Sequence, residues 1–177
     1  MSTAKDLQDQ GIKLYQRKEY EEAARLFQKA QEMYASEGDK TMVAEMQTNI
    51  GLVHRSLGEY QQALDIMSMA LHTLQEVGDS LRVAQVLGNM GGVYLELSDR
   101  EQAYNCYRQA ADVFDELGEK KLYAETMLAM GALQVREGKF MQGASTYEVG
   151  LEYLDALSPP QKFLKWVIGI RNKVMDR

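Results

Sequence analysis

Cysteine, proline, histidine and tryptophan are all scarce in this sequence of 177 residues, which has one, two, two and one of them. The single cysteine, Cys106, excludes an intramolecular disulfide and a metal site built from several cysteines, and it favours a reducing compartment. Proline interrupts helices, so a chain with only two prolines can be helical over most of its length. These scarcities predict a helical protein that folds without disulfides.

Positive charge and long apolar runs are also missing. The net charge of −6 argues against a nucleic-acid partner, because such proteins usually carry a basic face. No stretch approaches the roughly 18 consecutive apolar residues that span a membrane. The first ten residues, MSTAKDLQDQ, have no apolar run after the lysine and so do not form a secretory signal. We expect a cytoplasmic protein with no nucleic acid and no membrane span.

Glycine, in contrast, recurs with a regular period. One set of glycines is spaced by 40 residues, and a second set keeps the same period. The first set is Gly11, Gly51, Gly91 and Gly131, and the second is Gly38, Gly78 and Gly118. Small and aromatic residues repeat at the same interval, so positions 40 apart form columns of equivalent residues. This period predicts an array of similar structural units.

Each unit contains two amphipathic helices. Apolar residues three and four positions apart occur on both sides of a break such as Gly58-Glu59, which indicates two helices joined by a tight turn. Gly38 and its equivalents stand where the second helix must end in a left-handed residue, and Asp39 and Asp79 follow as N-caps. We expect the column of Gly11 to lie where the two helices of a unit approach most closely.

These features resemble the tetratricopeptide repeat. The third unit reads Leu87-x2-Met90-Gly91-x2-Tyr94 and continues with Ala103, Tyr107 and Ala110, in agreement with the signature of that family. The period of 40 is similar to the long-repeat variant of kinesin light chains, Leu-Gly-Asn-repeat adaptors and bacterial Rap-type regulators. The resemblance implies a single domain, an all-α right-handed superhelix of four helix pairs plus a C-terminal capping helix. The predicted repeats span 4–38, 41–78, 81–118 and 121–157, and the capping helix spans 160–175.

The resemblance also implies that the first helices line a concave groove that binds a peptide. Asn49 and Asn89 lie one repeat apart in an outward column, and a primary amide can pair with a peptide backbone unit through its donor and its acceptor. In the long-repeat proteins, asparagines in this column hold a bound peptide. The alternative is that Asn49 and Asn89 only link neighbouring repeats. Gly88 and Gly92 are expected to lower the groove floor beside Asn89. The predicted peptide-binding residues are Asn49, Asn89, Leu52, Arg55, Gln85, Gly88, Gly92, Leu128 and Arg136.

The residues that could carry chemistry are few and scattered. His54 falls in an interior column and is interpreted as a hydrogen-bonded core histidine, whereas His72 falls in an outward polar column. Cys106 is interpreted as a small buried core residue. No catalytic constellation results, so we expect no enzyme, no cofactor and no metal. The predicted function is a protein–protein interaction adaptor, a monomer or weak oligomer, that binds a peptide or helical segment of a partner protein.

The last segment differs from the repeats. Residues 161–177 carry a charge of +4, while residues 1–160 carry −10. A stripe of Phe163, Val167, Ile170 and Val174 predicts a helix that caps the last repeat, with Trp166 left exposed at its rim. The alternative function is a structural self-assembly module, in which this basic amphipathic helix docks on another copy or on a membrane surface.

Overall fold

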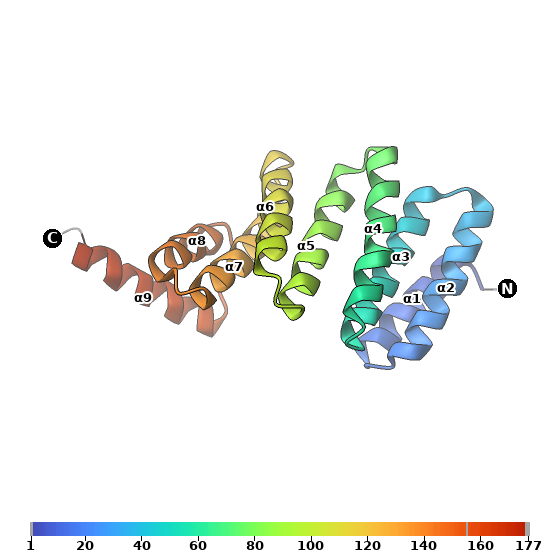
Figure 1. The fold of residues 1–177 in the computed structure, drawn as a ribbon, viewed down its shortest axis with the longest axis horizontal. Helices are drawn as coiled ribbons and strands as arrows, with labels where there is room; N and C mark the ends of the chain where they lie inside the picture. The colour runs from blue at the N-terminus through green and yellow to red at the C-terminus, as the bar shows by residue number, and fades with distance from the viewer. Residues whose placement is uncertain (1, 155, 176–177) are drawn as a thin grey trace. The chain divides into compact units, whose positions relative to one another are not determined.

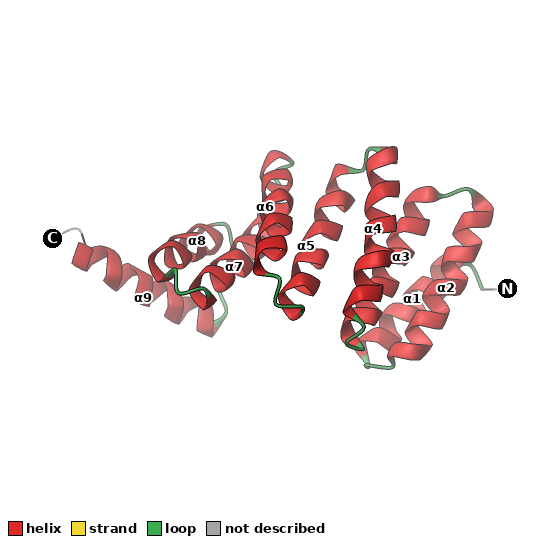
Figure 2. Cartoon of the chain, viewed as in Figure 1, coloured by secondary structure: helices red, strands yellow, loops and turns green. Residues whose placement is uncertain are grey.

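The computed structural model describes residues 2–154 and 156–175, with the side chains of 170–175 left out. The described residues form nine helices and no strand (Figure 2). The helices are α1 (Ala4–Gln16), α2 (Tyr20–Glu37), α3 (Lys40–Ser56), α4 (Tyr60–Val77), α5 (Ser80–Glu96), α6 (Arg100–Glu116), α7 (Lys120–Arg136), α8 (Phe140–Glu152) and α9 (Pro159–Met175). The prediction of an all-α chain with four helix pairs and a C-terminal helix is confirmed.

The chain divides into two compact units, Met1–Ala103 and Tyr104–Arg177, and α6 crosses the boundary. In the first unit each helix from α1 to α4 packs on the next one, and α3 also contacts α5 (Figure 1). In the second unit α7 packs on α8, and α8 contacts α9. The single domain and the right-handed superhelix expected for the whole array stay predictions.

The predicted helix ends are confirmed by the backbone. Gly38 and Gly78 end α2 and α4 with φ of 77°, in the left-handed region where glycine carries no side-chain clash. Gly118 adopts the same region, with φ of 70°. The carboxylates of Asp39 and Asp79 accept hydrogen bonds from the backbone amides of the third helical residues, at 3.0 Å each. The second helix of a repeat therefore ends and the next helix begins within two residues.

The packing glycines lie where the helices of a pair meet. A Cβ built on Gly11 would lie 2.7 Å from Cε1 of Phe27 in α2, and one on Gly51 would lie 2.7 Å from Cγ of Met67 in α4. In the second unit a Cβ on Gly143 would lie 2.9 Å from the backbone oxygen of Gly131. Each distance is shorter than an ordinary van der Waals contact, so an added side chain would require the neighbouring atoms to move.

We predict different costs for filling these contacts. Gly143→Ala should lower the free energy of unfolding by about 1–3 kcal/mol, because backbone atoms cannot move aside. Gly51→Ala should stay within about 1 kcal/mol of the wild type, since Met67 is flexible and alanine favours the helix. Gly169, in α9, has nothing within 4 Å of a Cβ and supplies the control. Urea unfolding measures the series; equal costs at Gly143 and Gly51 would contradict the packing account.

The turn inside each repeat also needs a left-handed residue, but only two repeats supply glycine. Gly58 and Gly138 have φ of 80° and 78°, whereas Lys18 and Ser98 take the same conformation at 64° and 62°. A left-handed conformation costs a residue with a Cβ roughly 1–2 kcal/mol. The first and third repeats therefore carry backbone strain at this turn.

We predict that Ser98→Gly and Lys18→Gly stabilise the protein. Glycine relieves the strain in the folded state, but it also makes the unfolded chain more flexible, which reduces the gain in stability. We therefore expect a gain of about 0.5–1 kcal/mol for each change. Gly58→Ala is the matched reverse change and should destabilise by a similar amount. Thermal unfolding measures all three variants, and a lower melting temperature for both glycine variants would contradict this account.

The end of the chain departs from the repeat. The helix α8 has 13 residues, against 17 or 18 in the other second helices, and it ends at Glu152. The next helix begins at Pro159, a favoured first helical residue, and the Ser158 amide donates to the Gln161 side chain at 2.8 Å. The helix α9 is thus started by its own local signals, after an irregular segment.

The buried face of α9 is not the predicted stripe. Ile168 is the buried side chain and Leu164 is half-buried, whereas Phe163 and Val167 are 65% and 41% exposed. The prediction that Phe163 and Val167 pack on the last repeat is therefore wrong, because the helix turns a different side toward the protein. Ile170 and Val174 lie outside the described side chains. The expected exposure of Trp166 is confirmed.

Candidate peptide-binding face

Seven of the predicted binding residues lie on two neighbouring helices of the first unit. Because α3 contacts α5 and residues three or four positions apart share one side of a helix, these residues form one surface, here called the first-helix face. From α3 it contains Asn49, Leu52 and Arg55, and from α5 it contains Gln85, Gly88, Asn89 and Gly92.

The two asparagines are half-buried. Among the residues that the structure describes, neither Asn49 nor Asn89 has a hydrogen-bond partner for its side-chain amide. A Cβ built on Gly88, one residue before Asn89, would meet nothing within 4 Å. The structure thus leaves the donor and the acceptor of both amides available.

Gly92 is covered by an arginine instead of being open. A Cβ built on Gly92 would lie 2.8, 2.9 and 3.0 Å from Nη1, Cζ and Nη2 of Arg55. These nearly equal distances mean that the guanidinium lies flat over the glycine. Nη2 of Arg55 is also 3.6 Å from Oε1 of Glu96. The space expected above Gly92 is therefore filled from within the protein, and of the two glycines only Gly88 is open.

The Arg55–Glu96 pair has an equivalent in the preceding repeat. The hydroxyl groups of Tyr15 and Ser56 lie 3.0 Å apart, and they link α1 to α3 across 41 residues. Arg55 and Glu96 are separated by the same number of residues and link α3 to α5. A polar bridge between successive first helices thus recurs near their C-terminal ends.

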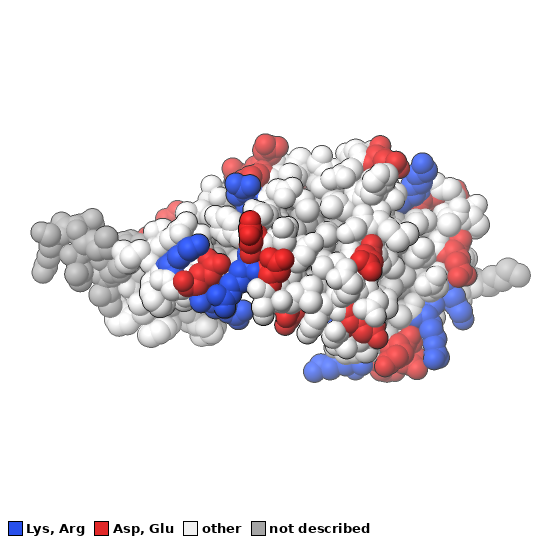
Figure 3. Space-filling view, viewed as in Figure 1, with Lys and Arg blue, Asp and Glu red and all other residues white. Residues whose placement is uncertain are grey.

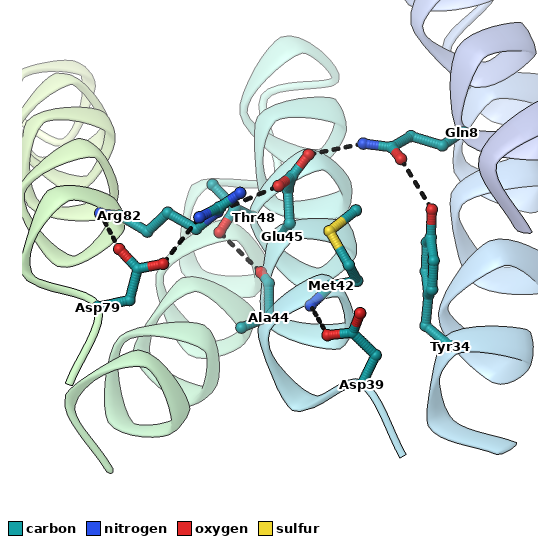
Figure 4. A network of polar contacts seen from close by, with 9 residues as sticks. All are labelled: Gln8, Tyr34, Asp39, Met42, Ala44, Glu45, Thr48, Asp79 and Arg82. Carbon is teal, nitrogen blue, oxygen red and sulfur yellow. Dashed lines mark hydrogen bonds and ion pairs between the residues drawn. The ribbon is translucent and has the colours of Figure 1, made fainter. Parts of the chain in front are cut away.

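A second series of bridges lies near the N-terminal ends (Figure 4). Nε2 of Gln8 in α1 donates to Oε1 of Glu45 in α3 at 2.6 Å, and Nε of Arg82 in α5 donates to Oε2 of Glu45 at 3.2 Å. Both contacts join residues 37 positions apart. The buried Gln8 also accepts a hydrogen bond from Tyr34 of α2 at 3.1 Å, so its amide uses both a donor and its acceptor.

Asp79, the N-cap of α5, completes this network. Nη1 of Arg82 donates to Oδ2 of Asp79 at 2.7 Å. Burial raises the pKa of Asp79, but the hydrogen bonds from the Arg82 amide and guanidinium outweigh it, and the net pKa is below the ordinary value. Asp79 therefore stays ionised at neutral pH and holds Arg82 toward Glu45.

We predict that Glu45→Ala lowers the free energy of unfolding by about 1–3 kcal/mol, because it removes the shared acceptor of Gln8 and Arg82. Glu96→Ala is the matched control, since its ion pair is longer and more exposed, and should cost at most about 1 kcal/mol. Urea unfolding compares the two variants. An equal effect would mean that the Glu45 network does not hold the repeats together.

The charges near this face are balanced within the protein. Lys5 pairs with Asp9 at 3.0 Å in α1, and the charges of Arg55, Glu45 and Arg82 are paired as described above. Because these charges are paired within the protein, the first-helix face offers no strong preference for a ligand of either sign. On the side of the molecule drawn in Figure 3, blue and red side chains likewise lie interspersed on a largely uncharged surface.

Leu128 and Arg136 lie on α7, in the second unit. Leu128 is half-buried, and its Cδ2 lies 3.2 Å from the position of a Cβ on Gly150 of α8. It therefore packs within its own helix pair. Arg136 is exposed in the last turn of α7. Their predicted role in peptide binding stays a prediction, as it does for the residues on α3 and α5.

The remaining reactive residues are accounted for individually. Cys106 is buried, as predicted, and His72 is exposed, as predicted. The prediction that His54 lies in the core is wrong: it is half-buried, and its Nδ1 lies 2.6 Å from Oε2 of Glu59 in the turn that follows. Within the described part of the chain, no three His, Cys, Asp or Glu residues are grouped to hold a metal. The expectation of no enzyme stays a prediction.

Comparison with known families decides the class of this fold. The model of the tetratricopeptide repeat matches residues 9–76 and 42–116, which together make up more than half of the chain. The chain belongs to the tetratricopeptide repeat family. Membership of this family supports the general role that the sequence predicts, which is interaction with another protein. No curated protein matches the sequence.

Solved structures with the same fold include BtubC (BKLC) from P. vanneervenii, with a TM-score of 0.67 and 18% identity over 94% of this chain and 64% of that one. A Rap protein complexed with Competence and Sporulation Factor gives 0.79 and 17%, over 85% of this chain and 42% of that one. Aspartyl phosphate phosphatase F from Bacillus subtilis gives 0.81 and 16%, over 85% and 39%. The tetratricopeptide chain thus spans less than two thirds of each of them.

Proposed function

We propose that this tetratricopeptide chain is an adaptor that binds a peptide or helical segment of a partner protein on its first-helix face. Family membership supports the general role. The available amides of Asn49 and Asn89 support this particular surface. They lie between two series of intramolecular bridges, one through Glu45 and one through Arg55, and those bridges occupy the neighbouring polar groups.

The amides suit recognition of a polypeptide backbone. A primary amide can donate to a peptide carbonyl and accept from a peptide N–H at the same time. Gln8 already uses its amide in both senses inside the protein. Because Asn49 and Asn89 are one repeat apart on adjacent helices, they offer two such pairs to one extended segment. Recognition of this kind depends little on the side chains of the ligand.

We predict that Asn49→Ala combined with Asn89→Ala weakens binding of a peptide ligand at least about 10-fold, since two paired amides at about 1 kcal/mol per hydrogen bond are lost. The probe is a peptide selected on the wild-type chain from a display library, and calorimetry measures its affinity. Gln62→Ala combined with Gln75→Ala is the matched control, because both glutamines are exposed on α4. Circular dichroism should show unchanged helicity in both variants.

Methylation of single backbone nitrogens in the selected peptide sharpens this test. At the units paired with Asn49 and Asn89, N-methylation should remove binding while alanine substitution at the same units should not. Unchanged affinity of the asparagine double variant would overturn the proposal. The proposal would also be overturned if the affinity of the peptide depended only on its side chains and not on its backbone nitrogens. A cytoplasmic location and a monomeric or weakly oligomeric state are part of the same proposal.

A further inference from the structure

The helix α9 is apolar on two sides, and only one of them is covered. Ile168 is 4% exposed and marks the covered side of α9, the helix that contacts α8. Phe163, Trp166 and Val167 stand on the other side, and Trp166 is 61% exposed. The rings of Phe163 and Trp166 lie against each other, with centroids 5.8 Å apart. These three residues are here called the outer aromatic face.

The repeats themselves show which residues this chain uses at such positions. Trp166 is the equivalent of Met46 in α3 and of Asp6 in α1. The stripe of Met46, Ile50 and Val53 is buried in α3, whereas the equivalent stripe of Asp6, Gln10 and Lys13 is exposed in α1. Where a first helix faces water, the stripe is polar. Trp166 is exposed at the first position of this stripe in α9, and the exposed Phe163 lies against it. This pair therefore indicates a surface that is covered when the protein acts.

The charge around the outer aromatic face indicates what covers it. Lys162 and Lys165 are exposed next to Phe163 and Trp166, and residues 161–177 carry +4. Two copies of α9 packed face to face would bring these like charges together. The exposed stripe of α1 is polar and gives a second copy no apolar surface for Trp166. An anionic lipid surface satisfies both the lysines and the aromatic rings.

We propose that α9 docks this protein on an anionic membrane surface, with the outer aromatic face in the lipid interface and Lys162 and Lys165 at the headgroups. Tryptophan favours this boundary, and lysine stems reach from it toward the anionic groups. None of the described helices is long and apolar enough to cross a bilayer, so the contact is peripheral. The proposal is independent of peptide binding on the first-helix face.

The only tryptophan of the chain reports this contact directly. The full chain is titrated with vesicles of phosphatidylcholine alone and of equal parts phosphatidylcholine and phosphatidylserine. We expect the emission of Trp166 to shift to shorter wavelength with the anionic vesicles only, and the shift to reverse at high salt. Vesicle co-sedimentation should give the same order of binding.

Two variants separate the contributions. Lys162→Glu with Lys165→Glu should weaken binding to the anionic vesicles at least about 30-fold, since each lysine near such a surface contributes about 1 kcal/mol. Phe163→Ala should weaken it at least about 10-fold through lost apolar burial. Phe140→Ala with Met141→Ala is the matched control, because both residues are exposed on α8, and it should bind as the wild type does. Circular dichroism checks that each variant is folded.

Several results would overturn the proposal. Emission that ignores anionic vesicles, or equal binding to neutral ones, excludes an anionic lipid surface. A spectral shift that follows protein concentration without lipid, with a doubled mass in light scattering, assigns the face to a second copy. Short-wavelength emission from the lipid-free monomer means that Trp166 is already buried.

Discussion

The close approach of two helices at residues without a side chain is the constraint on which this structure depends. Gly51 lies against Met67, and in the second unit Gly131 and Gly143 bring two backbones together. Close contacts of this kind lie at Gly11, Gly51 and Gly131, which share one column of the 40-residue repeat, so these first helices present the same columns in the same order. The period that places the packing glycines also places Asn49 and Asn89 one repeat apart.

Equal spacing also makes one polar contact between repeats recur. The contacts of Tyr15 with Ser56 and of Arg55 with Glu96 join the same two columns near the C-terminal ends of the first helices. Near the N-terminal ends, Glu45 accepts hydrogen bonds from Gln8 and Arg82, which belong to different columns. The amides of Asn49 and Asn89 lie between these bridges and have no partner among the described residues, so the proposed binding would use columns of the same helices that the bridges leave free.

The repeat, the helix ends and the packing glycines could be predicted because each depends on one column or on local backbone conformation. The position of the Arg55 guanidinium over Gly92 could not be predicted, because it depends on the rotation of α5 relative to α3. His54 shares a column with interior residues, yet its ring reaches Glu59 in the turn. In α9 the sequence offers two apolar sides, and the early end of α8 at Glu152 precedes a helix that turns Ile168 inward.

The most direct test of the central claim follows the side-chain amides themselves. In a nitrogen-15 labelled protein, the side-chain NH₂ signals of Asn49 and Asn89 are assigned by comparison with the two single alanine variants. On titration with a bound peptide, both signals should shift together and saturate at the same ratio, because both amides pair with the ligand backbone. Signals that stay unchanged while the peptide binds would show that these asparagines do not hold it.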